Sequence, residues 1–132
     1  MKKPIDKTPS HPTAIGPIQH LAFKEVGFQH QTANFKAIDK ISFEAKKGET
    51  IAFVGPSGAG KTTITNLLPR FYDVIEGAIR IGGIDVRQLA QRQIRHAVGV
   101  VTQDSHLFHD TIRANLLFAK PDATDEEMLV AI

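Results

Sequence analysis

The sequence contains no cysteine, and this absence excludes a disulfide framework and catalysis by a thiol. No apolar run approaches the roughly 18 residues that a membrane span needs. The first 17 residues also lack the apolar core of a signal peptide. The formal net charge of +2 is too small to make nucleic acid or an acidic membrane the main partner. We therefore expect a soluble or membrane-docked domain that has no transmembrane segment. We also expect this domain to bind no nucleic acid.

Length and composition indicate one globular domain preceded by a linker. The chain has 132 residues, and its hydrophobic and charged fractions of 42% and 23% are ordinary for folded proteins. Residues 1–17 contain four prolines among Lys, Thr, Ser and His, which prevents a regular helix or a central strand and buries little surface. We predict a Pro-rich linker over residues 1–17 and an ordered domain over residues 18–132.

A glycine-rich stretch, FVGPSGAGKTT, carries the clearest functional signal. Gly55, Gly60, Lys61 and Thr62 fit the pattern G-x-x-x-x-G-K-[ST], in which the backbone wraps around a phosphate. An apolar run precedes the stretch and a helix-like segment follows it, which is the order that phosphate binding requires. The alternative, a glycine-rich turn that ends in Lys-Thr by chance, is disfavoured by this context.

The pattern predicts a site for the phosphates of a nucleoside triphosphate and for Mg²⁺. Backbone N–H groups in the second half of the loop would point at the phosphates. Lys61 would neutralise the β- and γ-phosphates, and the Thr62 hydroxyl would ligate Mg²⁺. The predicted binding residues are Gly55, Pro56, Ser57, Gly58, Ala59, Gly60, Lys61, Thr62 and Thr63.

Hydrophobic alternation predicts strands on both sides of the loop. Residues 18–30 form one strand, and residues 35–55 form two that turn at Gly48. Residues 77–86 form a short strand with a Gly-Gly turn, and residues 98–103 form a strand of the buried type. The three strands before the loop would make an antiparallel lead-in to it.

The helical segments carry recognisable start signals. Asp110 or Thr111 can cap one helix, and Thr124 with Glu127 forms a capping-box pattern at the start of another. The expected helices cover residues 61–68, 89–97, 110–119 and 124–132.

The order of these pieces resembles the ATP-binding domain of an ATP-binding-cassette (ABC) transporter. More narrowly it is similar to the exporter branch, in which the ATPase domain follows a membrane domain on the same polypeptide. The phrases RFYDV, GAIRIGGID and LFHDTIRAN separate this family from nucleotide kinases and small GTPases, which share only the loop. The resemblance covers about residues 21–132. It implies an α/β fold, a P-loop NTPase core that is incomplete here, with an N-terminal antiparallel β-subdomain and ATP and Mg²⁺ as ligands.

The resemblance assigns roles to residues after the loop. Gln103 matches the glutamine that contacts Mg²⁺ and the attacking water, which makes it the expected catalytic residue and, with Thr62, a metal ligand. The alternative for Gln103 is a polar residue that caps a strand. Leu107 and Phe108 are the expected contacts with a coupling helix of the membrane domain, and the alternative is that both belong to the core.

At one position the sequence departs from the family. The family's first strand, V-x-F-x-Y, supplies a tyrosine whose ring stacks on adenine, whereas this chain reads VGFQH and has His30 there. Imidazole offers less stacking area, and its charge can change in the physiological pH range. We expect weaker, pH-sensitive ATP binding if His30 stacks on the base. The alternative is an exposed residue at a strand end.

The residues that hydrolysis requires in this family are absent from the sequence. They are an apolar strand ending in Asp-Glu, a signature sequence LSGGQ and a later His. The downstream carboxylates lie in a loop and at a helix start, where helix capping explains them; they are Asp122, Asp125, Glu126 and Glu127. We therefore expect the isolated chain to bind ATP weakly, to hydrolyse almost none, and to be marginally stable or to self-associate. In the full protein two such domains would sandwich ATP at the cytoplasmic face of a membrane.

Other interpretations stay open at this point. A non-catalytic nucleotide-binding or regulatory module would share the loop and lack turnover. A small-molecule kinase would need an Arg-rich lid, but the spacing of Arg87, Arg92 and Arg95 fits an exposed helix face better. His106 and His109 have an i, i+3 spacing, yet a solvated loop explains them better than a metal site, since there is no Cys and no suitably spaced carboxylate.

Overall fold

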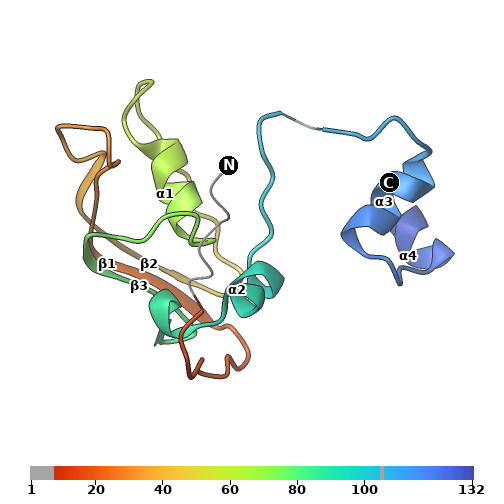
Figure 1. The fold of residues 1–132 in the computed structure, drawn as a ribbon, viewed down its shortest axis with the longest axis horizontal. Helices are drawn as coiled ribbons and strands as arrows, with labels where there is room; N and C mark the ends of the chain where they lie inside the picture. The colour runs from red at the N-terminus through yellow and green to blue at the C-terminus, as the bar shows by residue number, and fades with distance from the viewer. Residues whose placement is uncertain (1–7, 105) are drawn as a thin grey trace. The chain divides into compact units, whose positions relative to one another are not determined.

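The computed structural model describes residues 8–104 and 106–132, which form two compact units. The first unit extends to Val100, and the second spans Val101–Ile132. Figure 1 shows the helices and strands in chain order. No helix within the described ranges combines the length and the apolar character that crossing a membrane requires.

The first unit is built on a four-stranded antiparallel sheet with the strand order β2-β1-β3-β4. Its strands are β1 (His20–Phe28), β2 (Ile38–Lys46), β3 (Glu76–Ile81) and β4 (Ile84–Asp85). β1 is an inner strand of the sheet, because Phe23 lies opposite Phe43 on one side and Ile79 on the other. The predicted antiparallel β-subdomain is thus confirmed for its first two strands.

An irregularity in β1 directs its apolar side chains into one core. The register shifts between Phe23 and Val26, where Glu25 has a positive φ of 48° and its N–H donates to Ser42 Oγ (2.9 Å). A bulge of this kind changes the alternation of faces along a strand. Residues three positions apart on a regular strand point to opposite faces, but here Phe23 and Val26 are both buried.

β3 and β4 form a tight hairpin. Ile81 pairs with Ile84, which leaves Gly82 and Gly83 as a two-residue turn. Their φ values of 58° and 83° have the sign that a type I′ turn requires at both central positions. The predicted Gly-Gly turn is confirmed.

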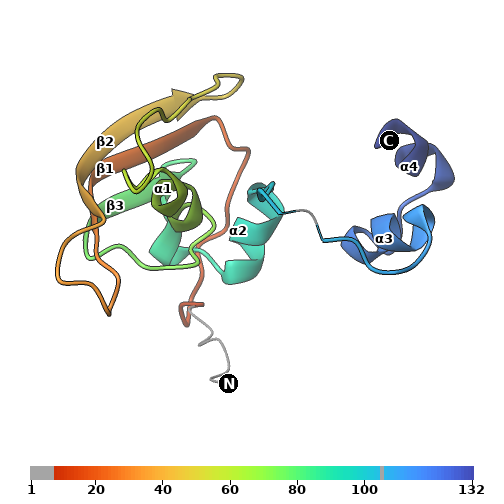
Figure 2. The ribbon, with the colours of Figure 1, turned by 90° about the horizontal axis from the view of Figure 1, so that it is seen from above.

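Helical segments cover the sheet and close the core. They are α1 (Lys61–Leu67), the 3₁₀ turn η1 (Val86–Gln88) and α2 (Gln91–Ala97). Figure 2 shows α1 against one face of the sheet. Ile64 and Leu67 of α1 belong to the same buried cluster as Phe23, Val26 and Ile94. The apolar face of α1 thus anchors the helix whose first residues carry the glycine-rich motif.

Two predicted strands are wrong. Residues 50–54 and 98–103 form no strand in the described structure, and Val54 and Val101 are 94% and 99% exposed. Both segments have strand composition, but a strand forms only where a neighbour pairs with its N–H and C=O groups. No described segment pairs with either of them.

Residues 8–17, part of the predicted linker, contact the first unit. Residues 8–17 form no helix or strand, as predicted, and residues 1–7 of that prediction lie outside the described residues. However, the Thr13 N–H donates to the Gln88 carbonyl (2.9 Å), and Gln93 Nε2 donates to the Thr13 carbonyl (3.0 Å). Ile15 packs on the core cluster. The stretch buries little, as expected, because residues 8–17 are exposed or half-buried, but these contacts attach it to the first unit.

The second unit contains α3 (Ile112–Ala119) and α4 (Asp125–Val130). Thr111, rather than Asp110, caps α3 by accepting the Ala114 N–H (3.1 Å). Thr124 and Glu127 form the predicted capping box of α4, with hydrogen bonds of 3.2 and 3.0 Å. Ion pairs connect the two helices: Arg113 Nη1 lies 2.8 Å from Asp125 Oδ1, and Lys120 Nζ lies 2.7 Å from Glu127 Oε1.

Replacement of Gly77 should destabilise the first unit more than replacement of a glycine in a free turn. Gly77 has a φ of 72°, and a Cβ there would overlap the carbonyl oxygens of Lys24 and Glu25 in the bulge of β1. We expect Gly77→Ala to lower the free energy of unfolding by about 3 kcal/mol, measured by urea unfolding. The control Gly82→Ala has a positive φ but open space around the new methyl group, and should cost about 1 kcal/mol. Equal losses for the two variants would contradict the steric argument.

Asp85 should stabilise the unit in a pH-dependent way. Partial burial raises the pKa of Asp85, but hydrogen bonds from the Arg87 guanidinium and backbone N–H outweigh it and hold the pKa below the usual 3.8. A depressed pKa means that the stabilisation is present above the unfolded-state pKa and is lost as the pH falls through the folded-state value. Asp85→Asn should therefore lower the free energy of unfolding by about 1 kcal/mol at pH 7.

The same difference should shrink at a pH well below 3.8, the ordinary pKa of the carboxyl group, because the stabilisation is lost as the folded-state carboxylate takes up its proton. Urea unfolding at the two pH values measures it. Asp122→Asn, in an exposed turn of the second unit, is the matched control and should leave the first unit unchanged. A difference that grew on acidification would show that Asp85 does not stabilise the fold as a carboxylate.

Candidate functional site

The glycine-rich loop, residues 55–63, is a turn that ends inside the first turn of α1. Gly58 and Gly60 have φ values of 81° and 90°, and Gly60 is the N-cap residue of the helix. The first helical bond runs from the Ile64 N–H to the Gly60 carbonyl (3.0 Å). The N–H groups of residues 61–63 therefore have no acceptor within the helix, and Gly60 has no side chain that could supply one. This arrangement favours an anion.

Gly60 also fixes the loop against the sheet. A Cβ at Gly60 would lie 2.8 Å from the Ala37 carbonyl oxygen and 2.8 Å from Ile38 Cδ1, where β2 begins. Only glycine allows this close approach together with a left-handed φ. The loop is therefore positioned by a backbone contact with the sheet.

The Lys61 side chain lies across the start of the loop. Its Nζ donates to the carbonyl oxygens of Gly55 (2.7 Å) and Pro56 (2.6 Å). The ammonium therefore closes the loop from one side. It can exchange these neutral acceptors for a charged phosphate oxygen, which forms a stronger hydrogen bond.

A groove of about 480 Å³ lies between the loop and the connection from β1 to β2. This volume falls within the range of small-molecule sites. The connection contributes Phe35, Lys36 and Ala37. The loop side is lined by Ser57, Gly58, Gly60, Lys61, Thr62 and Thr63.

Lys36 places a second positive charge in this groove and ties the connection to β3. Its Nζ lies 2.8 Å from both carboxylate oxygens of Glu76 and 3.0 Å from Asp39 Oδ1. The hydrogen bond with Glu76, and then that with Asp39, raises the pKa of Lys36 above its usual value. Lys36 therefore carries its positive charge at neutral pH.

His30 lies in a cluster of aromatic rings. Its imidazole contacts Phe28 at 4.8 Å and Tyr72 at 5.4 Å between ring centroids, and both pairs are edge-on at 85°. The side chain is half-buried and does not line the groove. His30 is therefore not simply an exposed residue at a strand end, because two rings pack against it. The contact of His30 with adenine stays a prediction.

Gln103, Leu107 and Phe108 belong to the second unit. Gln103 is exposed, and its predicted role beside Mg²⁺ stays a prediction. Leu107 and Phe108 are 81% and 57% exposed, so neither is a core residue of this unit. The Phe108 ring packs on Phe118 with 4.6 Å between centroids. The two side chains thus leave an apolar surface open.

The described residues do not assemble a metal cluster of His and carboxylate side chains. No group of three or more such side chains gathers within residues 8–104 and 106–132, and the loop interpretation of His106 and His109 stays a prediction. Asp125, Glu126 and Glu127 lie in the first turn of α4, as predicted for helix-capping charge.

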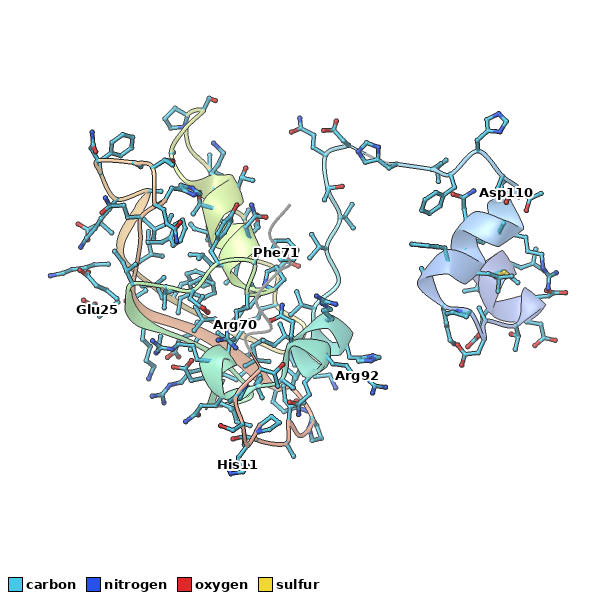
Figure 3. All side chains as sticks on the ribbon, viewed as in Figure 1. His11, Glu25, Arg70, Phe71, Arg92 and Asp110 are labelled. Carbon is cyan, nitrogen blue, oxygen red and sulfur yellow. The ribbon has the colours of Figure 1, made fainter. Side chains whose placement is uncertain are left out.

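Sequence reasoning missed two residues. Phe35 lines the groove. The only sequence feature that could have indicated this is that Phe35 is an aromatic residue in an otherwise polar connection. Arg70, labelled in Figure 3, is buried with a positive φ of 58°. Its Nε donates to Asp73 Oδ1 (2.7 Å). Arg70 Nη1 also reaches the Val86 carbonyl (3.4 Å), which connects the segment after α1 to η1. The phrase RFYDV contained this pair, but its letters did not show that the arginine is buried.

A left-handed glycine at the helix start, a lysine across the loop and a groove beside them define a nucleotide-binding protein of the P-loop class. Residues 38–132 match the family described as ABC transporter, and the chain belongs to this family. The predicted fold class is confirmed: it is a P-loop NTPase core with an antiparallel β-subdomain. The chain forms part of this fold.

Two similar proteins have names that refer to export and to lipid flipping. The chain is 45% identical over 109 residues to the "putative multidrug export ATP-binding/permease protein YgaD" of Bacillus subtilis, covering 83% of this chain and 19% of the relative. It is 40% identical over 127 residues to the "ATP-dependent lipid A-core flippase" of Desulfotalea psychrophila, covering 96% of this chain and 22% of the relative.

A solved structure agrees with this assignment. The structure of a bacterial Atm1-family ABC exporter with ATP bound superposes with a TM-score of 0.81 at 39% identity, covering 90% of this chain and 21% of that one. The chain therefore spans about a fifth of the length of the relatives it matches, and the predicted resemblance to an exporter ATP-binding domain is confirmed.

Replacement of Gly60 should disrupt the loop more than replacement of Gly58, because both have a positive φ but only Gly60 also lacks space for a side chain. The Gly60→Ala methyl group would press on the Ala37 carbonyl and on Ile38, so the loop would have to leave the sheet. We expect at least about tenfold weaker binding of Mg-tripolyphosphate and a cost of about 2 kcal/mol in unfolding free energy. Gly58→Ala, with a φ of 81° and open space around the added methyl group, is the matched control. If both variants bind alike, the contact with Ala37 does not position the loop.

Proposed function

We propose that this chain is the part of an ABC exporter's ATP-binding domain that holds the phosphates of ATP and its Mg²⁺. The observation that carries the proposal is the loop over residues 55–63, which Gly60 fixes on the sheet and Lys61 spans. The loop presents free N–H groups and an ammonium to one side of a groove of suitable size.

The residues present fit the phosphates and the metal. The N–H groups of residues 61–63 would donate to phosphate oxygens, and Lys61 would move from two carbonyls to the β- and γ-phosphates. The exposed Thr62 lies where its hydroxyl can ligate Mg²⁺. Bound Mg²⁺ would offset the negative charge of the phosphates.

The chain's own residues support binding rather than turnover. Hydrolysis requires a group that positions or activates water, and Gln103 is the residue proposed to orient it. No apolar run of the sequence ends in an Asp-Glu pair. The carboxylates of α4 are engaged at the start of that helix, where Glu127 accepts from the Thr124 N–H. We propose that hydrolysis depends on residues that this chain does not supply.

We also propose two protein partners in a complete transporter. The Bacillus subtilis relative is named as a putative ATP-binding/permease protein, which supports a membrane domain as one partner. The chain would then lie at the cytoplasmic face of that membrane. The open apolar surface of Leu107 and Phe108 supports a contact with that domain. A second ATP-binding domain would complete the nucleotide site.

Calorimetric titration of MgATP into the chain tests the proposed function. Lys61→Ala removes the ammonium, and we expect at least about 30-fold weaker binding, because a charge-assisted hydrogen bond to phosphate is lost. Lys47→Ala, at an exposed lysine in the turn after β2, is the charge-matched control and should bind as the parent does. Equal binding by parent and Lys61→Ala would exclude this loop as the site.

A further inference from the structure

We infer that Phe35 is the side chain that stacks on the base of the bound nucleotide. The inference rests on the proposed nucleotide binding and concerns the same groove. It assigns the base contact to the connection between β1 and β2 rather than to His30.

The first observation is where Phe35 lies. Its side chain is 74% exposed and lines the groove next to Lys36 and Ala37, across from the phosphate loop. The connection that carries it, QTANFK, is otherwise polar or small. A large aromatic ring left open at the edge of a polar groove offers a flat apolar surface of the kind on which bases stack.

The second observation is that the connection is held on both sides of Phe35. Before it, the Ala33 N–H donates to the His30 carbonyl (3.0 Å), and Gln29 Nε2 donates to the Ala33 carbonyl (2.7 Å). After it, the Ala37 N–H donates to the Phe28 carbonyl (2.8 Å). The backbone that carries Phe35 is therefore largely fixed before a ligand arrives, which lowers the ordering cost of binding.

Lys36 strengthens this anchoring. Its ion pair with Glu76 joins the residue next to Phe35 to the first residue of β3. Phe35 is thus an exposed side chain on a connection that hydrogen bonds hold both before and after it.

The third observation concerns His30, the other ring considered for this role. His30 is half-buried and contacts Phe28 and Tyr72 edge-on, and it does not line the groove. Stacking requires an open ring face beside the phosphate site. Phe35 has such a face, because most of its side chain is exposed and it borders the same groove as the loop.

A fluorescence experiment can test the contact directly, because the chain contains no tryptophan. Phe35→Trp places a single indole at this position, and His30→Trp is the matched control. Each variant is titrated with MgATP and with Mg-tripolyphosphate, which has the phosphates but no base. We expect MgATP, and not Mg-tripolyphosphate, to quench the indole of Phe35→Trp, and neither to quench that of His30→Trp. Base-dependent quenching in His30→Trp alone would overturn the inference.

A second measurement compares the affinities of Phe35→Ala and the parent chain for MgATP and for Mg-tripolyphosphate. Truncation should weaken MgATP binding about tenfold and leave Mg-tripolyphosphate binding unchanged, since stacking acts on the base alone. Lys61→Ala should weaken both. Because Phe35 is exposed, its truncation should not move the urea midpoint.

The outcomes separate this inference from the proposed function. If the parent binds both ligands and Phe35→Ala binds MgATP equally well, the inference is wrong and the proposed function stands. If the parent binds neither ligand, the proposed function fails and the inference fails with it.

Discussion

The contact on which the site depends is the approach of Gly60 to the carbonyl of Ala37. It brings the start of α1 against the start of β2 at a distance that no side chain permits. Ala37 is itself tied to the end of β1 through the Phe28 carbonyl. Through these contacts the glycine-rich loop takes its position from β1, an inner strand of the sheet, even though the loop is exposed along most of its length. A binding loop attached to paired strands keeps its geometry better than a free turn.

The same contact explains why the groove has two walls. The residues just before Ala37 form the connection from β1 to β2, and the residues around Gly60 form the loop, so packing Ala37 on Gly60 makes the two segments neighbours. One wall offers N–H groups and the Lys61 ammonium, and the other offers a ring and a second ammonium. A nucleotide has this division, with charged phosphates at one end and a flat apolar base at the other.

Locally determined features could be predicted from the sequence. The glycine-rich turn before α1, the Gly82–Gly83 turn and the Thr124–Glu127 capping box each depend on a few adjacent residues with restricted φ or a short side-chain hydrogen bond. Features that depend on distant neighbours could not. The apolar run before the loop predicted a strand, but its composition does not say whether another strand pairs with it.

The residues that the sequence did not predict as important also depend on distant neighbours. Phe35 has no periodicity that would distinguish it from an ordinary exposed residue of a loop, because its importance comes from its distance to a loop more than 20 residues later. The burial of Arg70 depends on η1, which follows a complete β-hairpin. The docking of Thr13 likewise needs Gln88 and Gln93. Each of these contacts joins segments that the sequence alone leaves separate.

The unpaired segment before the loop has a physical consequence for binding. Residues 50–54 are held chiefly by Phe53, whose ring lies edge-on to Phe43 at 5.3 Å, while Val54 is solvent-exposed. A partly open apolar pocket of about 220 Å³ beside them, lined by Ile51, Phe53 and Leu68 among others, shows that packing there is loose. The loop is therefore firmly held on the side of α1 and weakly held on the side from which the chain enters it. A phosphate that binds both ends must order the weak side, which reduces the affinity by the cost of that ordering, and any strand that pairs with residues 50–54 would remove the cost.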